Sequence, residues 1–165
     1  MKPSKTSSRR ILGIDPGLAS TGWGVIDEVN GNIIYIDHGM IETKASCPRA
    51  ERLFFIMKSV RKIISKYKPS GAAVETIYFG KNVSSAIPVA EARGVISAVI
   101  AEKGIQLNEL TPNTIKMGVT GHARADKEQV QEMVRLILNL DKIPKPDHAA
   151  DALAAAICAL SKLQL

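Results

Sequence analysis

The sequence predicts an α/β domain in which helices pack on a mixed β-sheet. Three strand-like segments follow one another near the N-terminus with no helical pattern between them. Helical and strand-like segments then alternate, which is the pattern of parallel strands joined by crossover helices. With 165 residues, of which 45% are hydrophobic and 23% are charged, the chain has the length of one domain and enough apolar residues for a core.

The first three strands are predicted to form an antiparallel meander. Residues 9–15 are largely apolar and stop at a Pro-Gly pair, as expected for a buried strand that ends in a turn. Residues 21–28 form the second predicted strand and residues 32–42 the third. Between these two strands lies an Asn-Gly pair, the turn that tight antiparallel hairpins prefer.

The middle of the chain predicts two helices, each followed by a strand. Residues 49–67 carry apolar side chains at three- and four-residue spacings, which indicates a helix with one buried face. The short apolar strand at residues 72–76 should return parallel to an earlier strand through a right-handed crossover. Residues 84–103 predict a helix whose first turn is distorted or capped by a proline, and residues 105–110 predict the fifth strand.

The C-terminal third predicts a loop and two helices. Residues 118–125 contain Gly, His and Arg and are predicted to be a loop, after a strand that a Thr-Pro pair closes. Asp126 and Gln129 have the spacing of a capping box, and an apolar helix face follows them. A last helix should run from residue 147 or 148 to about residue 163, because prolines precede it. The predicted order is β-β-β-α-β-α-β-loop-α-α.

The charge is uneven along the chain. The 22 basic and 16 acidic residues give 22 − 16 = +6, and the first ten residues alone contribute +4. We predict that residues 1–9 form a basic, solvated tail with phosphate contact as its possible use, and that residues 10–165 form the folded domain. We favour this tail over a targeting peptide because the apolar stretch behind it, residues 11–14, is too short for the apolar region of a signal peptide.

The sequence also excludes a membrane span and a disulfide scaffold. The longest weakly polar run, residues 149–160, is 12 residues long and contains Asp151, whereas a bilayer core needs about 20 apolar residues. Two cysteines, Cys47 and Cys158, are too few for a disulfide framework and show no CxxC spacing. We interpret both as free thiols in a reducing compartment.

Four acidic or imidazole side chains interrupt apolar segments. Asp15 ends the first predicted strand and Glu75 lies in the fourth, so parallel pairing would bring both carboxylates to one edge of the sheet. His148 and Asp151 are three residues apart and share one face of the last helix. Buried carboxylates are unfavourable unless a cation neutralises them, and oxygen ligands suit Mg²⁺ or Mn²⁺.

Each of these residues has a structural alternative. Asp15 can be a turn residue, Asp147 a helix N-cap, and Asp151 a solvent-facing residue. Glu75 is harder to explain in this way because Glu is disfavoured in so apolar a strand. The combination of the four residues, rather than any one of them, favours a metal site.

Several motifs resemble the RuvC family of Holliday-junction resolvases. They are GIDPG (13–17), TGWGV (21–25), VE (74–75), KN (81–82), ARG (92–94) and AADALA (149–154). The resemblance extends from about residue 10 to about residue 160. It implies a ribonuclease H-like fold, with a five-stranded mixed sheet flanked by helices.

The resemblance also implies an activity and partners. The family consists of homodimeric, metal-dependent endonucleases that bind four-way DNA junctions and nick two strands of like polarity, so that ligase can seal the ends. Such an enzyme would act in homologous recombination and DNA repair in the cytoplasm. The RuvA and RuvB branch-migration proteins would be its partners.

By matched position, Asp15, Glu75 and Asp151 would be catalytic carboxylates that bind two Mg²⁺ ions. His148 falls where the family pattern has a fourth carboxylate. As a neutral imidazole it can ligate a metal, and it would suit Mn²⁺ better than Mg²⁺. It could alternatively act as a general base on the attacking water.

Further positions are predicted to contact DNA. Lys116 and Lys127 match basic positions near the family's active site and would neutralise a phosphate. Tyr78 would stack on an unpaired base at the junction centre, with Phe79 as a competing candidate. The complete predicted DNA-binding set is Tyr78, Lys81, Lys116, Arg124 and Lys127.

Three other functions remain compatible with the sequence. The first motif also resembles a phosphate loop of actin-like ATPases, but those proteins need two related domains. Another ribonuclease H-like nuclease, of the YqgF type, fits less well after Glu75. A family member that binds junctions without cutting them is conceivable because of His148, and a metal-dependent rate would distinguish an enzyme from it.

Overall fold

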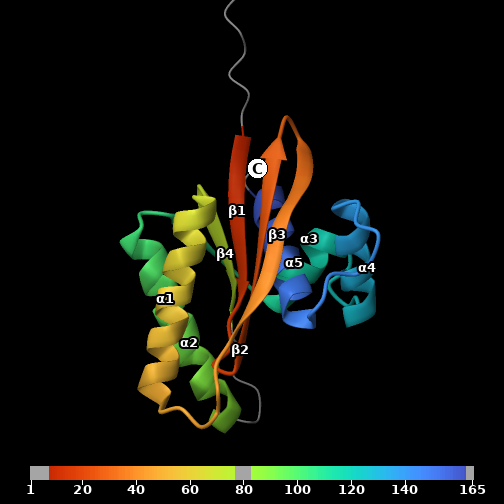
Figure 1. Ribbon diagram of the computed structural model, residues 1–165. Coiled ribbons are helices and arrows are strands. Elements are labelled where there is room, and N and C mark those ends of the chain that lie inside the picture. Colours follow the sequence, from red (N-terminus) through yellow and green to blue (C-terminus); the bar gives the residue numbers. More distant parts are fainter. Residues whose placement is uncertain (1–7, 77–82, 163–165) are drawn as a thin grey trace, which may run out of the picture.

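The computed structural model describes residues 8–76 and 83–162. The strands are β1 (Ser8–Asp15), β2 (Ser20–Val29), β3 (Asn32–Glu42), β4 (Gly71–Glu75) and β5 (Gln106–Leu110). The helices are α1 (Arg49–Tyr67), α2 (Val83–Glu102), α3 (Pro112–Thr120), α4 (Lys127–Ile137) and α5 (Asp147–Lys162). Helices α1 and α2 lie on one side of the sheet, and α5 lies on the other side with α3 and α4 beside it (Figure 1).

The predicted mixed sheet is confirmed. Its strand order is β3-β2-β1-β4-β5, with β1, β2 and β3 antiparallel and β1, β4 and β5 parallel. Ile14 of β1 is paired with Val74 of β4, so the next residue of each strand, Asp15 and Glu75, reaches the same edge of the sheet. This edge lies at the bottom of Figure 1.

The prediction missed helix α3 and wrongly placed residues 118–120 in a loop. A Thr-Pro pair after a strand indicates a stop, but Pro is also favoured in the first turn of a helix. Thr111 caps this helix, because its side chain accepts a hydrogen bond from the Thr114 backbone N–H. The helix is only 9 residues long and buries just Ile115 and Val119, so its periodic signal is weak.

Strand β1 begins at Ser8, so the last two residues of the predicted tail, residues 8 and 9, belong to the sheet. Arg9 and Arg10 form ion pairs across the sheet, with Nε of each lying 3.0 Å from Glu28 and 2.7 Å from Asp27 respectively. Half of the positive charge assigned to the first ten residues is therefore neutralised within the sheet. The remainder of the predicted tail lies outside the described residues.

The alanine-rich helix α5 packs unusually close to β1 and β2. A Cβ on Gly13 would lie 1.9 Å from the Ala152 carbonyl oxygen, and one on Gly22 would lie 2.0 Å from the His148 carbonyl oxygen. Only glycine permits this approach, because any side chain would push the helix away from the sheet. The close approach brings the first turns of α5 to the end of β1.

Two further predictions concern membrane-spanning helices and disulfide bonds. Among the helices of the described chain, none is long and apolar enough to cross a membrane. Cys47 is exposed and Cys158 is buried in α5, so these two described cysteines are not joined by a disulfide.

Candidate active site

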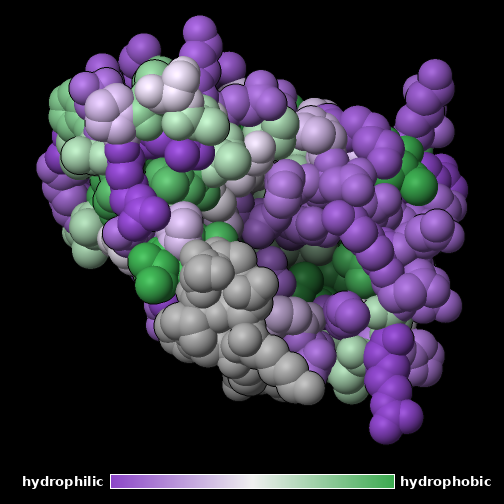
Figure 2. All heavy atoms as spheres, turned by 90° about the horizontal axis from the view of Figure 1, so that it is seen from below, coloured by the Kyte–Doolittle hydropathy of each residue, from purple (hydrophilic) through white to green (hydrophobic). Residues whose placement is uncertain are grey.

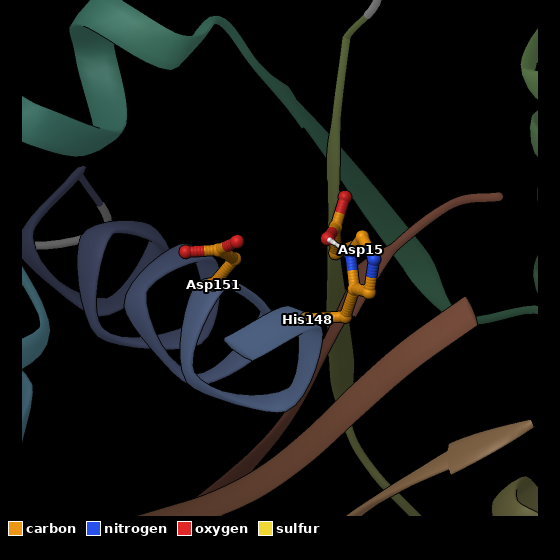
Figure 3. A group of neighbouring side chains, drawn as sticks. All are labelled: Asp15, His148 and Asp151. Atoms are coloured by element: carbon orange, nitrogen blue, oxygen red, sulfur yellow. Dashed lines mark hydrogen bonds and ion pairs between the residues drawn. The ribbon is translucent and has the colours of Figure 1, made fainter. Parts of the chain in front are cut away.

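Three potential metal ligands meet where β1 ends and α5 begins. Among the described residues, one ligand atom from each of Asp15, His148 and Asp151 lies within 4.8 Å of the others. Figure 3 shows the imidazole of His148 beside the Asp15 carboxylate, with Asp151 one turn further along the helix. The Nδ1 atom of His148 is 2.7 Å from Asp15 Oδ2.

Glu75 completes the predicted quartet from the neighbouring strand. Glu75 follows Val74, the strand partner of Ile14, so its side chain is a neighbour of Asp15 at the end of the sheet. Burial raises the pKa of Glu75 to about 7, and the nearby charges of Asp15 and Asp151 act in the same direction. The structure therefore brings all four predicted residues to one edge of the sheet, although Glu75 is not within the closest group of three.

The electrostatics of the cluster favour a bound cation. Burial also raises the pKa of Asp15 and of Asp151, and the Asp15 charge adds to the effect on Asp151. When these three carboxyl groups are ionised, they repel one another and lack water to stabilise their charges. A bound cation would relieve both effects. Three carboxylates and one imidazole provide oxygen and nitrogen donors that fit Mg²⁺ or Mn²⁺.

Lys127, at the start of α4, reaches the acidic cluster. Its Nζ lies 3.6 Å from Asp151 Oδ2 and 3.3 Å from Asp147 Oδ2. Burial opposes its positive charge, but the two carboxylates outweigh this effect, so the pKa of Lys127 is raised. The ammonium is thus fixed at the border of the cluster.

A cavity of about 200 Å³ lies next to these residues. Glu75, Asp151, Lys116 and Lys127 supply its polar lining, and helix side chains such as Ile115 and Val130 supply an apolar one. The view onto this end of the molecule shows a hollow with hydrophobic residues at its floor and hydrophilic residues around it (Figure 2). Lys116 and Lys127 therefore lie beside the carboxylates, as predicted.

Of the remaining predicted DNA-binding residues, the structure describes Arg124. Arg124 is exposed on the connection between α3 and α4. Tyr78, its competitor Phe79, and Lys81 lie outside the described residues.

Sequence reasoning missed the contacts of Asp147. The sequence allows an N-cap role for Asp147, but the structure makes it the first residue of α5 itself. Its carboxylate binds Lys127 and also Lys145, whose Nζ lies 2.8 Å from Asp147 Oδ1. Hydrogen bonds from Lys145 and then Lys127 lower the pKa of Asp147 to about 2. No local pattern signals the contact with Lys127, because the two residues are far apart in sequence.

The sheet order and the flanking helices are those of the ribonuclease H-like fold, and acidic side chains lie at the ends of β1 and β4 and on the last helix. The family model for "Crossover junction endodeoxyribonuclease RuvC" matches residues 11–159. The chain belongs to this family. It is therefore an endonuclease that hydrolyses phosphodiester bonds at DNA crossover junctions, and the predicted fold and enzyme class are confirmed.

Individual relatives agree with this assignment. The chain is 52% identical over 147 residues to a RuvC crossover junction endodeoxyribonuclease from Treponema denticola, covering 89% of this chain and 83% of the relative. A relative from Roseiflexus is 46% identical over 152 residues, covering 92% and 90%. The solved structure of Thermus thermophilus RuvC with a Holliday junction substrate superposes with a TM-score of 0.89 at 32% identity, covering 94% of this chain and 95% of that one.

Proposed function

We propose that this chain resolves four-way DNA junctions by metal-dependent hydrolysis at the cluster of Asp15, Glu75, His148 and Asp151, in homologous recombination and DNA repair. The observation that carries the proposal is the convergence of these side chains from two parallel strands and one helix. The similar Thermus thermophilus protein was solved with a Holliday junction substrate, which supports the same substrate here.

In this proposal the three carboxylates and His148 hold two divalent ions, Mg²⁺ or Mn²⁺. Such ions activate a water molecule on one side of a phosphodiester and stabilise the leaving oxygen on the other. The protein's own residues hold the ions and place phosphate. Glu75 is partly protonated near neutral pH when no ion is present, so ion binding must release its proton. His148 as a general base is the alternative role.

Lys116 and Lys127 are proposed to neutralise the phosphate that is cut or its neighbour. Both line the cavity beside Glu75 and Asp151, where a phosphate on the cluster would be within reach of their ammonium groups. Arg124, Tyr78 and Lys81 are proposed as further DNA contacts by family resemblance.

Symmetric cutting of a junction requires two active sites, so we propose a homodimer. Helix α1 leaves Phe54 and Phe55 about half exposed, and Ile87 on α2 is similarly exposed. Large exposed apolar side chains favour contact with a second copy. RuvA and RuvB as partners and a cytoplasmic location are proposed from the family alone.

The test is nicking of an immobile four-way junction beside a linear duplex of the same sequence, in Mg²⁺, in Mn²⁺ and in EDTA. The wild type should give paired, metal-dependent nicks confined to the junction. Asp15→Asn should abolish nicking while junction binding persists, because it removes a metal ligand and leaves the basic surface unchanged. Asp141→Asn, an equal change of charge at an exposed position, is the control. Normal cutting by Asp15→Asn would refute the site.

A further inference from the structure

We propose that Asp147 is a positioning residue, which keeps the Lys127 ammonium at the border of the active site and prevents it from settling on Asp151. Lys127 then faces the DNA phosphate while Asp151 remains available to a metal ion. This inference rests on the proposed function, because it takes the acidic cluster as the cutting site.

The contacts of Lys127 support this role. Its Nζ is shared between two carboxylates and lies slightly nearer to Asp147, at 3.3 Å, than to Asp151, at 3.6 Å. The second oxygen of Asp147 is bound by Lys145 at 2.8 Å. Each oxygen of Asp147 therefore has one lysine, and this arrangement fixes the direction in which the carboxylate pulls on Lys127.

The surroundings of the two carboxylates explain why a second one is needed. The Asp151 side chain is 30% exposed and the Asp147 side chain is 45% exposed. Charges interact more strongly where less water screens them, so a lone Asp151 would attract the ammonium inward. An ammonium on Asp151 competes with a metal ion for the same oxygens. Asp147 lies outside the group of metal ligands formed by Asp15, His148 and Asp151, so it can hold Lys127 without using a ligand.

The inference predicts that Asp147 acts through Lys127. Single-turnover nicking of the junction should be measured against Mg²⁺ concentration for the wild type, Asp147→Asn, Asp147→Glu, Lys127→Met and the double variant Asp147→Asn with Lys127→Met. Because the pair is half exposed, Asp147→Asn should lower the maximal rate about threefold to fivefold. It should also raise the Mg²⁺ concentration needed for half the maximal rate.

Two comparisons separate positioning from a merely structural effect. Asp147→Glu should recover most of the rate, because it keeps a carboxylate within reach of Lys127. In the Lys127→Met background, Asp147→Asn should change the rate by less than about twofold, because no ammonium is left to position. Asp141→Asn should match the wild type.

The proposal is overturned if Asp147→Asn lowers the rate by the same factor with and without Lys127, or if Asp147→Glu is no better than Asp147→Asn. An unchanged Mg²⁺ requirement would also overturn it. Thermal unfolding of each variant shows whether a loss of rate comes from a loss of stability. A stability effect of Asp147→Asn would also lower the rate in the Lys127→Met background, so the double variant separates it from positioning. If the proposed function itself fails, Asp15→Asn cuts normally; if only this inference fails, Asp15→Asn stays inactive.

Discussion

Replacing Glu75 by Gln should stabilise the metal-free protein while abolishing nicking. Glu75 lies at the end of β4 beside Asp15, and burial raises its pKa from the ordinary 4.5 to about 7. The folded protein therefore binds a proton at Glu75 more tightly than the unfolded chain does. Stability from this source is fully present below about pH 4.5 and is lost as the pH rises through about 7.

The size of this effect on the free energy of unfolding follows from the two pKa values of Glu75, 4.5 and about 7. Each pH unit between them corresponds to about 1.36 kcal/mol, so ionised Glu75 destabilises the fold by about 3 kcal/mol at pH 8 and by less than about 1 kcal/mol at pH 5. Gln keeps the shape of the side chain and cannot ionise. At pH 8 the variant should gain most of that free energy of unfolding, which for a domain of this size raises the melting temperature by about 5 to 10 °C.

The assay is thermal unfolding of both proteins in EDTA at pH 5 and pH 8, followed by circular dichroism. The gain should be large at pH 8 and small at pH 5. Added Mg²⁺ should narrow the difference at pH 8, because an ion that binds the folded wild type stabilises it by mass action. An equal gain at both pH values, or a loss at pH 8, would refute the electrostatic account of Glu75.

Two further predictions concern α5. His148→Asp should keep nicking activity and shift the preference from Mn²⁺ toward Mg²⁺, because it exchanges a nitrogen donor for oxygen; inactivity in both metals would mean that His148 does more than bind an ion. Gly22→Ala should lower the free energy of unfolding by about 1 to 3 kcal/mol and slow nicking, because its Cβ would lie 2.0 Å from the His148 carbonyl oxygen. Gly94→Ala on α2 is the matched control, since nothing lies within 4 Å of its Cβ, and an equal loss of stability there would contradict the packing explanation.

Much of the fold could be predicted because its signals are local. The meander follows from three consecutive apolar segments and an Asn-Gly turn, and the observed β2 and β3 differ from the predicted strands by at most one residue at each end. Helix α3 could not be predicted in this way. Its capping Thr111 and Pro112 resemble the end of a strand as much as the start of a helix. So short a helix is stabilised by packing against α5 and α4, which are distant in sequence or follow it.

The candidate site shows the same division. The residue types and spacings in the sequence were sufficient to select Asp15, Glu75, His148 and Asp151, because acidic residues inside apolar segments are unfavourable without a purpose. Distances between those residues depend on strand pairing and on two glycines that admit α5, which are contacts between distant segments.

Local patterns in the sequence were therefore enough to predict the order of the elements, apart from α3, and the residue types of the candidate site, since both depend on neighbouring residues. Tertiary structure alone decided that Arg9 and Arg10 are paired within the sheet rather than available in a tail. It also decided that Lys127 lies between Asp147 and Asp151. Charges interact through space and without regard to sequence separation, so their partners become known only when the chain is folded.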